Sequence, residues 1–449
     1  MSNDQDQSKT AQEMLAKKAR LMWLQANPDM EHIEDLYRSA ISSCCCCCSL
    51  KSAIQPVASK AGIRRRFCDD ESGDEKHSAA TAITDWQRLA MEQLCMILCQ
   101  TERSNEAKPM LEKLGYVCRL ATCVLNYPLQ DDTTTGSSSI SNNSSNRTDI
   151  LCHAWDSFLS TCELQHLRDV FEDRNADYWL QHDYRVEPPS PYFSYVVPLT
   201  RSKVSDSNHK VSIDDRFGCL GDIILNLYQH LLPLFPQLSS ATMVEFWAHN
   251  RPHPTGHQFH FDSDNEGQGR IIKNPIMTAI FYLSGVGSSS DDVEDSATHF
   301  AAGGPSIVTN QTLHSRHMAT KAVMSIATSP GRLVAFDGKL LHGVIPGKGG
   351  HSGSRRVTLM LAFWKRIRIR PSETPGAARP YPFPTSASAP TDRWNNLLVR
   401  PSTVTAQNPR PVPVSRNPLP LDRVYETLDG DKWTKAMGFP EYDQVYQGF

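Results

Sequence analysis

Between Met243 and Trp364, short apolar segments follow the two-residue period of β-strands and alternate with clusters of Gly, Pro, Ser or Asp. About seven or eight short strands at this spacing are typical of a jelly-roll β-sandwich or barrel. The polar stretch Ser284–Ala302 is expected to form a loop between two of them. The strands expected from the pattern are Met243–Trp247, His257–Asp262, Ile276–Leu283, Ser306–Thr309, Ala322–Ala327, Arg332–Phe336 and Arg356–Trp364.

The chain upstream of these strands favours helices. Thr84 and Ser160 are each followed three positions later by Gln or Glu, which is the spacing of a capping box at a helix start. A further helix is expected over Pro109–Leu125, and Asp214–Leu232 has the clearest amphipathic pattern. The expected fold class is therefore α+β, with a jelly-roll core buttressed by N-terminal helices. The apolar stripe of the amphipathic helix is formed by Leu220, Ile223, Ile224, Leu227 and Leu231.

Composition suggests where the core ends. Apolar residues make up 39% of the 449 positions, and the many Pro and Ser residues indicate sizeable stretches that cannot build a core. We expect a mostly disordered segment with a cysteine run at 1–75, a helical region at 76–130, a Ser/Thr/Asn linker at 131–149, helical support at 150–240, the β-core at 241–370, and a Pro-rich tail with a C-terminal aromatic segment at 371–449.

The thirteen cysteines are distributed unevenly. Five form the run Cys44–Cys48, and none follows Cys219. Neighbouring cysteines in a run cannot all adopt disulfide geometry, so a reducing compartment fits this distribution best. We interpret the run as low-complexity sequence within a linker, with palmitoylation and metal binding as the alternatives.

The sequence contains no evident targeting or membrane segment. Met1–Asn27 lacks a basic start followed by an apolar run, and acidic residues appear early. No stretch approaches the roughly 20 apolar residues that span a bilayer. A net charge of −3 gives no electrostatic reason to expect nucleic acid or a membrane surface as partner. We expect a cytoplasmic protein, with the nucleus as the alternative.

The triplet His260-Phe261-Asp262 carries the first chemical signal. Side chains two apart on a strand point to the same face, so the imidazole and the carboxylate would project together. Two histidines and one carboxylate form the facial triad of non-heme Fe(II) sites, which leaves coordination positions open. His342, which follows a buried strand and a turn, is the expected third ligand.

Arg356 and Thr358 carry the second signal, because they would share one face of the last core strand. The planar guanidinium group is suited to bidentate recognition of a carboxylate. A dicarboxylate could therefore anchor one end on Arg356 while its other end reaches the metal. The neighbouring Arg355 is expected to solubilise a sheet edge.

Together these motifs resemble the 2-oxoglutarate- and Fe(II)-dependent dioxygenase superfamily, over about Met243 to Lys365. The similarity is greatest to the prolyl-4-hydroxylase-like branch, in which a tyrosine strand and a Gly-Gly turn separate the metal motifs; here these are Phe281–Leu283 and Gly303–Ser306. The resemblance implies a double-stranded β-helix fold. It also implies iron ligation by His260, Asp262 and His342, binding of the distal carboxylate of 2-oxoglutarate by Arg356 with Thr358, and a further hydrogen bond from Tyr282.

The resemblance also implies an activity. Such an enzyme binds 2-oxoglutarate, then its substrate, then dioxygen, and releases succinate and carbon dioxide as it hydroxylates the substrate; ascorbate is a further expected cofactor. The presence of Asp262 favours hydroxylation over the related halogenases. Prolyl hydroxylases typically have Lys at the position of Arg356, so a prolyl substrate does not follow. A protein side chain and a small metabolite remain equally open as substrates.

The same residues are open to other interpretations. The stretch Asp262–Lys273 superficially resembles a calcium loop, but its twelfth position is Lys where a Glu is required. A zinc hydrolase would lack its usual helical motif and give Arg356 no role. A catalytically inactive scaffold that binds protein partners, for example through the Pro-rich tail, is the main alternative. The other nearby histidines are expected on loops or the surface, and of these His257 is the one placed to line the site entrance: His253, His257, His299, His314, His317 and His351.

Overall fold

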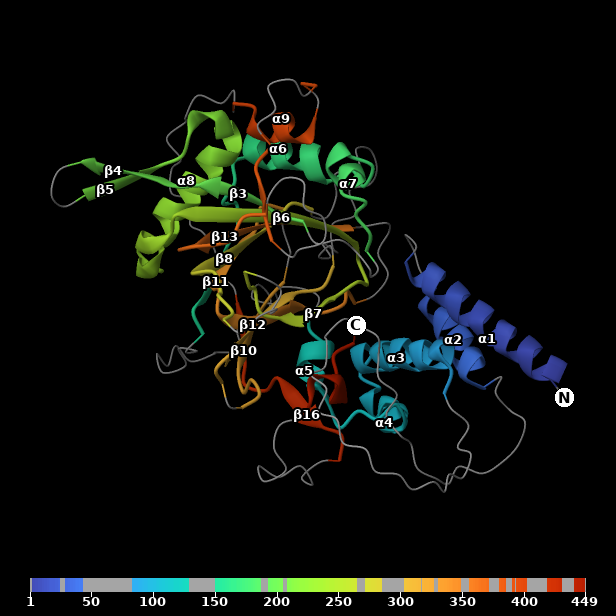
Figure 1. Ribbon diagram of the computed structural model, residues 1–449. Helices are drawn as coiled ribbons and strands as arrows, with labels where there is room; N and C mark the ends of the chain where they lie inside the picture. The colour runs from blue at the N-terminus through green and yellow to red at the C-terminus, as the bar shows by residue number, and fades with distance from the viewer. Residues whose placement is uncertain are drawn as a thin grey trace, which may run out of the picture. The chain divides into compact units, whose positions relative to one another are not determined.

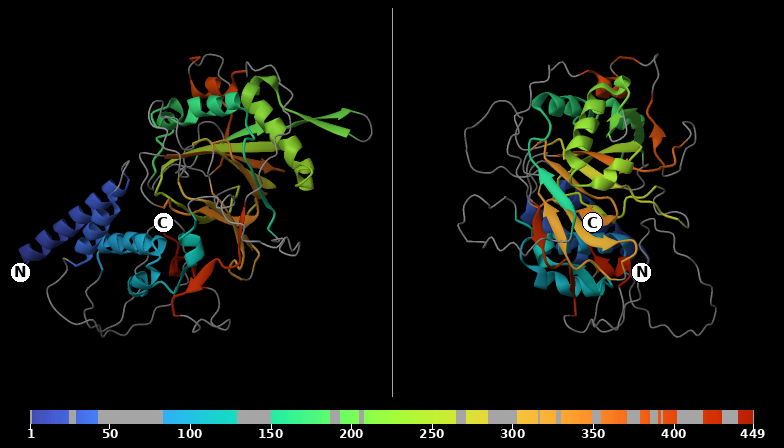
Figure 2. Two further views of the ribbon diagram at one scale, coloured as in Figure 1. Left: turned by 180° about the vertical axis from the view of Figure 1, so that it is seen from behind. Right: turned by 90° about the vertical axis from the view of Figure 1, so that its left-hand side faces the viewer.

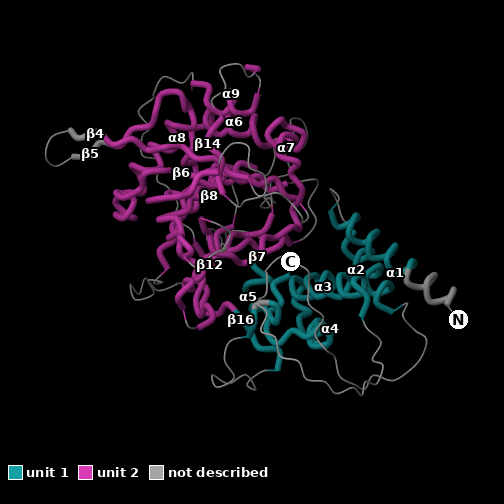
Figure 3. The backbone as a smooth tube through the Cα atoms, in the orientation of Figure 1, with its two compact units in different colours: residues 1–127, 425–448 teal, residues 128–424, 449 magenta. Residues whose placement is uncertain are grey.

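In the computed structural model, the chain forms two compact units (Figure 3). Unit 1 combines residues 1–127 with 425–448, and unit 2 spans residues 128–424. The cysteine run and the 131–149 linker lie outside the described residues. The structure describes residues 2–24, 29–42, 83–128, 150–186, 193–204, 208–264, 271–284, 303–315, 317–326, 330–348, 355–370, 379–384, 390–391, 393–401, 418–429 and 440–448.

Unit 1 is a group of helices joined by a small sheet. Its helices are α1 (Ser2–Trp23), α2 (Met30–Ser42), α3 (Asp85–Gln100), α4 (Ser104–Lys113) and α5 (Thr122–Leu125), and its sheet has the order β16 (Tyr425–Thr427), β1 (Cys118–Leu120), β17 (Val445–Tyr446), with a 3₁₀ turn at Tyr442–Gln444. The capping box expected at Thr84 is formed with Gln87 and starts α3. The expected helix over Pro109–Leu125 is wrong, because α4 ends before Gly115, which has a φ of +86°.

The C-terminal tail contributes to both units. Leu419–Leu421 forms β15 in unit 2, whereas β16 and β17 flank β1 in unit 1. Tyr446 is 2% exposed, and its hydroxyl donates to the carbonyl of Glu92 at 2.6 Å. Tyr446, in the aromatic C-terminal segment expected from the sequence, is thus buried within unit 1.

Unit 2 is built on two large sheets that face each other across an apolar layer (Figure 1). Each strand expected from Met243 onward has a counterpart in the structure, but the one expected over His257–Asp262 ends at His260. The seven-stranded sheet has the order β14 (Tyr381–Pro382), β3 (Tyr195–Pro198), β6 (Met243–Pro252), β13 (Arg355–Trp364), β8 (Met277–Tyr282), β11 (Leu333–Asp337), β2 (Cys152–Trp155); the five-stranded sheet has the order β15, β10 (Ala322–Ser325), β9 (Ser306–Thr312), β12 (Leu340–Val344), β7 (His257–His260); β4 (Thr200–Val204) and β5 (Asn208–Ser212) form a separate ribbon.

The strands from β6 to β13 pair in a nested order. β6 pairs with β13, β7 with β12, β8 with β11, and β9 with β10, each pair antiparallel. Successive strands therefore alternate between the two sheets, except that β9 and β10 are neighbours in the five-stranded sheet. This arrangement brings residues that are far apart in the sequence onto facing strands.

Helices cover the outer face of the seven-stranded sheet, as the expected buttressing role requires. Figure 2 shows the green helices of residues 161–231 stacked on that face. The expected stripe of α8 is buried in the same apolar cluster as Phe246 and Leu361 of the sheet. Burial of each such aliphatic side chain contributes about 1.5–3 kcal/mol. The helices are α6 (Thr161–Phe171), α7 (Asp177–Gln181), α8 (Gly218–Leu231) and α9 (Trp394–Val399), with 3₁₀ turns at Asp215–Phe217 and Pro236–Ser240.

The described residues give two further findings. The seven cysteines among them are free, five of them buried. None of the described helices combines the length and the apolar character that crossing a membrane requires.

Candidate metal and co-substrate site

The expected metal triad comes together on the inner side of the five-stranded sheet. His260 ends β7, and Asp262 follows two positions later in the connection to β8. His342 on β12 is the direct cross-strand neighbour of His260. The nested pairing of β7 with β12 therefore brings the distant histidine to the H-x-D triplet.

The distances within the triad suit a single metal ion. The Oδ1 atom of Asp262 lies 3.7 Å from Nε2 of His260 and 3.6 Å from Nε2 of His342. All three ligand atoms lie within 4.8 Å of one another. Atoms separated by 3.6–3.7 Å can both lie about 2.1 Å from one ion, which is a usual metal–ligand distance.

The remaining polar atoms of the triad are held by hydrogen bonds. Nδ1 of His260 lies 2.8 Å from the carbonyl of Gln258, and Nδ1 of His342 lies 2.9 Å from that of Leu340. A backbone carbonyl can only accept, so each Nδ1 carries the proton and each Nε2 presents a lone pair toward Asp262. This orientation of ligand histidines by a second hydrogen bond is typical of metal sites.

Asp262 is oriented in the same way. Its Oδ2 atom accepts a hydrogen bond of 2.7 Å from the hydroxyl of Thr278, and its carbonyl accepts one of 2.7 Å from the side-chain amide of Asn274. Its Oδ1 atom is the one turned to the two histidines. The donor set and its supports therefore fit a divalent metal.

The triad is shielded on one side and accessible on the other. The side chains of Asp262 and His342 are 8% and 9% exposed, whereas that of His260 is 35% exposed. Burial and the neighbouring His342 lower the pKa of His260 to about 4, against an opposing effect of Asp262. His260 is therefore neutral at physiological pH, as a metal ligand must be.

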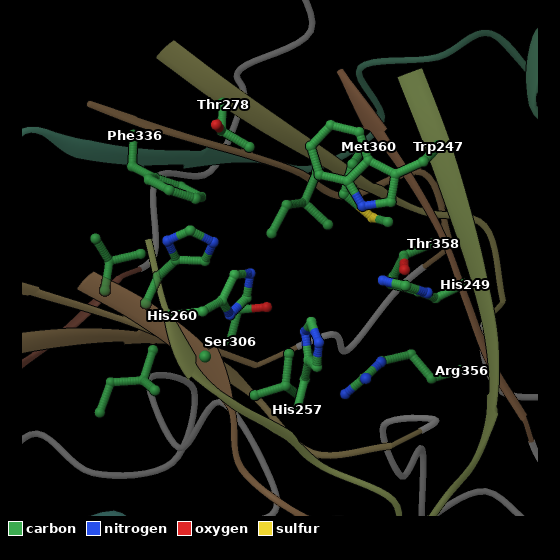
Figure 4. Close-up of a pocket in the computed structure, with 16 residues that line it drawn as sticks. Trp247, His249, His257, His260, Thr278, Ser306, Phe336, Arg356, Thr358 and Met360 are labelled. Carbon is green, nitrogen blue, oxygen red and sulfur yellow. The ribbon is translucent and has the colours of Figure 1, made fainter. Parts of the chain in front are cut away.

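A pocket beside the triad lies between the two sheets (Figure 4). The space enclosed between its lining side chains is about 540 Å³, part of which is open to solvent. One part is polar, with Arg356, Thr358, His249 and His257. The other part is mostly apolar and is lined by Trp247, Ile280, Val308, Phe336 and Met360.

The two residues expected to bind a carboxylate both line the polar part. Arg356 and Thr358 lie two apart on β13, and Arg356 is 2% exposed. Gly303 packs against the stem of this arginine: a Cβ there would lie 2.8 Å from the arginine Cβ, and its φ is +82°. Only glycine fits both constraints, so the Gly-Gly turn noted in the sequence shapes the wall of the pocket.

Tyr282 lies outside the set of side chains that line this pocket. It is fully buried on β8, and its hydroxyl pairs with the hydroxyl of Ser306, which does line the pocket. The hydrogen bond from Tyr282 to a co-substrate that the resemblance implies stays a prediction. Arg355, expected at a sheet edge, binds Asn250 through its Nε and Nη2 atoms instead.

Sequence reasoning missed three residues of the site. His249 was missed because the expected strand ended at Trp247; β6 continues to Pro252, and alternation then turns His249 inward. Thr278 gave no signal of its own. His253, expected on the surface, is 5% exposed; its Nδ1 accepts the Gly303 N–H at 2.9 Å.

His257 lines the pocket as expected, with its ring centroid 4.4 Å from that of His260. The register of β7 and β12 shifts between these two histidines, which allows residues three apart to face the same pocket. Burial lowers the pKa of His257 well below the usual value, and the neighbouring His260 and Arg251 add to this effect. Burial likewise lowers the pKa of His249, with Arg251 and Arg356 as further causes.

These shifts predict a pH-dependent stability of the metal-free protein. Below a pH of about 6.5, the unfolded chain binds protons that a buried neutral His249 does not bind, so the free energy of unfolding falls with decreasing pH. The loss should approach at most about 1.4 kcal/mol per pH unit for this group. Urea denaturation of the wild type and His249→Gln between pH 5 and 7.5 measures the free energy of unfolding at each pH. This free energy should depend less steeply on pH in the variant.

The control is the exposed His314→Gln, which should retain the wild-type slope. Equal slopes for the wild type and His249→Gln would contradict the buried neutral state of this histidine.

Comparisons with known proteins give structural similarity without a sequence match. No family model and no curated protein matches the chain. It is similar to a Pseudomonas putida prolyl-4-hydroxylase at 14% identity, covering 49% of this chain and 90% of that one, with a TM-score of 0.27. It is similar to a collagen prolyl hydroxylase of Paramecium Bursaria Chlorella virus-1 at 14% identity, covering 48% of this chain and 96% of that one, with a TM-score of 0.25. It is also similar to a 2OG-Fe(II) oxygenase family oxidoreductase of Burkholderia pseudomallei at 11% identity, covering 47% of this chain and 82% of that one, with a TM-score of 0.25.

At these identities and TM-scores, the chemistry of the chain has to be derived from its own side chains.

Proposed function

We propose that the chain is an Fe(II)- and 2-oxoglutarate-dependent dioxygenase. The observation that carries the proposal is the convergence, in one pocket, of the His260–Asp262–His342 triad with the carboxylate-binding pair Arg356 and Thr358. A triad with open positions accommodates a chelating 2-oxo acid and dioxygen. An arginine in the same pocket gives a second carboxylate a place to bind.

We also propose that unit 2 has the double-stranded β-helix fold of such enzymes. The nested pairing of β6–β13, β7–β12, β8–β11 and β9–β10 supports it, because a jelly roll is an antiparallel pairing of first with last strand wound into two sheets. The triad lies on the sheet that contains β7 and β12, and the arginine lies on the opposite sheet.

Each residue then has a defined task. His260, Asp262 and His342 would hold the iron, and Thr278 would keep the second oxygen of Asp262 from turning toward it. Arg356 and Thr358 would orient the distal carboxylate of 2-oxoglutarate. Bound iron supplies the oxidising chemistry, in which 2-oxoglutarate and dioxygen give succinate, carbon dioxide and one oxygen atom for the substrate.

The substrate would be a compound with an unreactive C–H bond that is converted to C–OH, and 2-oxoglutarate and this C–H bond would each supply two of the four electrons that reduce dioxygen. A protein side chain and a small metabolite both fit this description. The apolar wall of Trp247, Phe336 and Met360 would exclude water from the reaction. Zinc in the same triad would leave Arg356 without a role.

Anaerobic titration with Fe(II) and 2-oxoglutarate tests the proposal. The wild-type protein should develop a metal-to-ligand charge-transfer band in the visible, with saturation at one equivalent of each. A folded protein that takes up Fe(II) but gives no band would contradict the proposal and favour a non-catalytic scaffold.

A further inference from the structure

His249 occupies a position in the pocket wall that neither the metal triad nor Arg356 explains. It is the direct cross-strand neighbour of Thr358, just as Arg251 is the neighbour of Arg356. Direct neighbours on an antiparallel pair share one face, so His249 and Thr358 project together from adjoining strands. Figure 4 shows His249, Thr358 and Arg356 along the same wall of the pocket.

The hydrogen bonds around His249 allow the tautomer that carries its proton at Nε2. The hydroxyl oxygen of Tyr184 accepts the backbone N–H of Asn250 at 3.3 Å and lies 3.4 Å from Nδ1 of His249. With that N–H already directed at its oxygen, the tyrosine can donate its own proton to Nδ1. A neutral imidazole that accepts at Nδ1 carries its proton at Nε2, so the ring has a donor left for the pocket.

Two cationic neighbours favour the same neutral form. Arg251 and Arg356 face each other across β6 and β13, and both lower the pKa of His249 in addition to the effect of burial. Like charges directly opposite on a sheet are unfavourable unless an anion compensates them. The polar part of the pocket thus presents donors and positive charge, which suits an anionic ligand group.

We propose that His249, held in its Nε2–H form by Tyr184, donates a third hydrogen bond to the distal carboxylate of 2-oxoglutarate, beside Arg356 and Thr358. The proposal rests on the proposed function, because it assigns a residue to the same co-substrate. It makes His249 a co-substrate-binding residue and Tyr184 a positioning residue.

A pair of 2-oxo acids isolates this contact. 2-Oxopentanoate has the chain length of 2-oxoglutarate without its distal carboxylate, so both chelate a metal but only one reaches His249. In anaerobic charge-transfer titrations of the Fe(II) protein, His249→Leu should reduce the affinity for 2-oxoglutarate by about 10- to 100-fold, as expected for a lost hydrogen bond to a charged group. The same variant should bind 2-oxopentanoate within about twofold of wild type.

Two matched variants separate a donor from mere packing. His249→Gln keeps a side-chain N–H donor and should recover most of the affinity for 2-oxoglutarate. Tyr184→Phe should reduce the affinity for 2-oxoglutarate by only a few-fold, because the imidazole of His249 remains while its proton is no longer fixed at Nε2. Binding of Co(II) and the circular dichroism spectrum report whether each variant retains the folded metal site.

The outcomes distinguish this proposal from the one on which it rests. A charge-transfer band in the wild type with unchanged 2-oxoglutarate affinity in His249→Leu overturns the role of His249 and leaves the proposed function intact. If His249→Leu loses affinity for both acids equally, the substitution has a general structural effect, and this outcome also overturns the role of His249. The absence of any band in the folded wild-type protein contradicts the proposed function itself.

Discussion

Replacement of His260 by alanine should abolish the Fe(II)–2-oxoglutarate charge-transfer band and reduce the affinity for Fe(II) by more than about 100-fold. The expectation follows from the loss of one of three ligand atoms, since even the loss of a residue that only supports a ligand costs about 10- to 100-fold in metal affinity. His260 is the most exposed member of the triad, so its truncation should disturb the surrounding packing least. Anaerobic metal titration and the visible spectrum measure the effect.

The control for this change is the exposed histidine of the loop after β9, in the variant His314→Ala. It should bind Fe(II) and 2-oxoglutarate as the wild type does. If His260→Ala kept its affinity for Fe(II) and its band, the metal would have to bind elsewhere, and the triad would be only a buried polar cluster.

Replacement of Arg356 by alanine should reduce the affinity for 2-oxoglutarate by about 30-fold to several thousand-fold, because loss of one partner of a buried charged pair costs about 2–5 kcal/mol. Fe(II) affinity should change little, because the arginine lies on the sheet opposite to the triad. Arg356→Lys should give an intermediate loss, since an ammonium group keeps the charge but not the bidentate fork. The charge-transfer titration measures the dissociation constant in each variant.

Arg355→Lys is the matched control on the same strand. The Arg355 guanidinium group binds Asn250 and not the pocket, so this variant should bind 2-oxoglutarate within about twofold of wild type. An equal loss in Arg355→Lys and Arg356→Lys would indicate a general disturbance of β13. An unchanged affinity in Arg356→Ala would place the carboxylate elsewhere in the pocket.

Several features of the fold could be predicted because they depend on local sequence. The capping boxes at Thr84 and Ser160 formed as expected, since the two partners lie three residues apart. The apolar stripe of α8 and the strands from Met243 onward follow from periodicity in the same way. Errors occurred where a boundary depended on one residue, as at Gly115, or on a partner strand, as in the extension of β6 to Pro252.

The end of the chain could not be placed from its own sequence. Tyr446 is an aromatic residue in a short strand, and nothing local specifies which apolar surface it covers. In the structure, β17 lies beside β1, and the Tyr446 hydroxyl reaches Glu92 in α3. Such contacts join segments more than 300 positions apart, and many alternatives have a similar local pattern.

The sequence by itself determined the chemical identity of the candidate site: an H-x-D triplet, a later histidine and an arginine two positions before a threonine. Strand periodicity predicted that Arg356 and Thr358 would lie together, as they do on β13. It predicted the same for His260 and Asp262, although Asp262 lies beyond the end of β7. Only the tertiary structure decided that His342 pairs with His260, that Thr278 holds Asp262, and that His249 faces the pocket. The physical reason is that strand register and sheet pairing are set by the burial of many side chains at once, whereas a motif records only its own few residues.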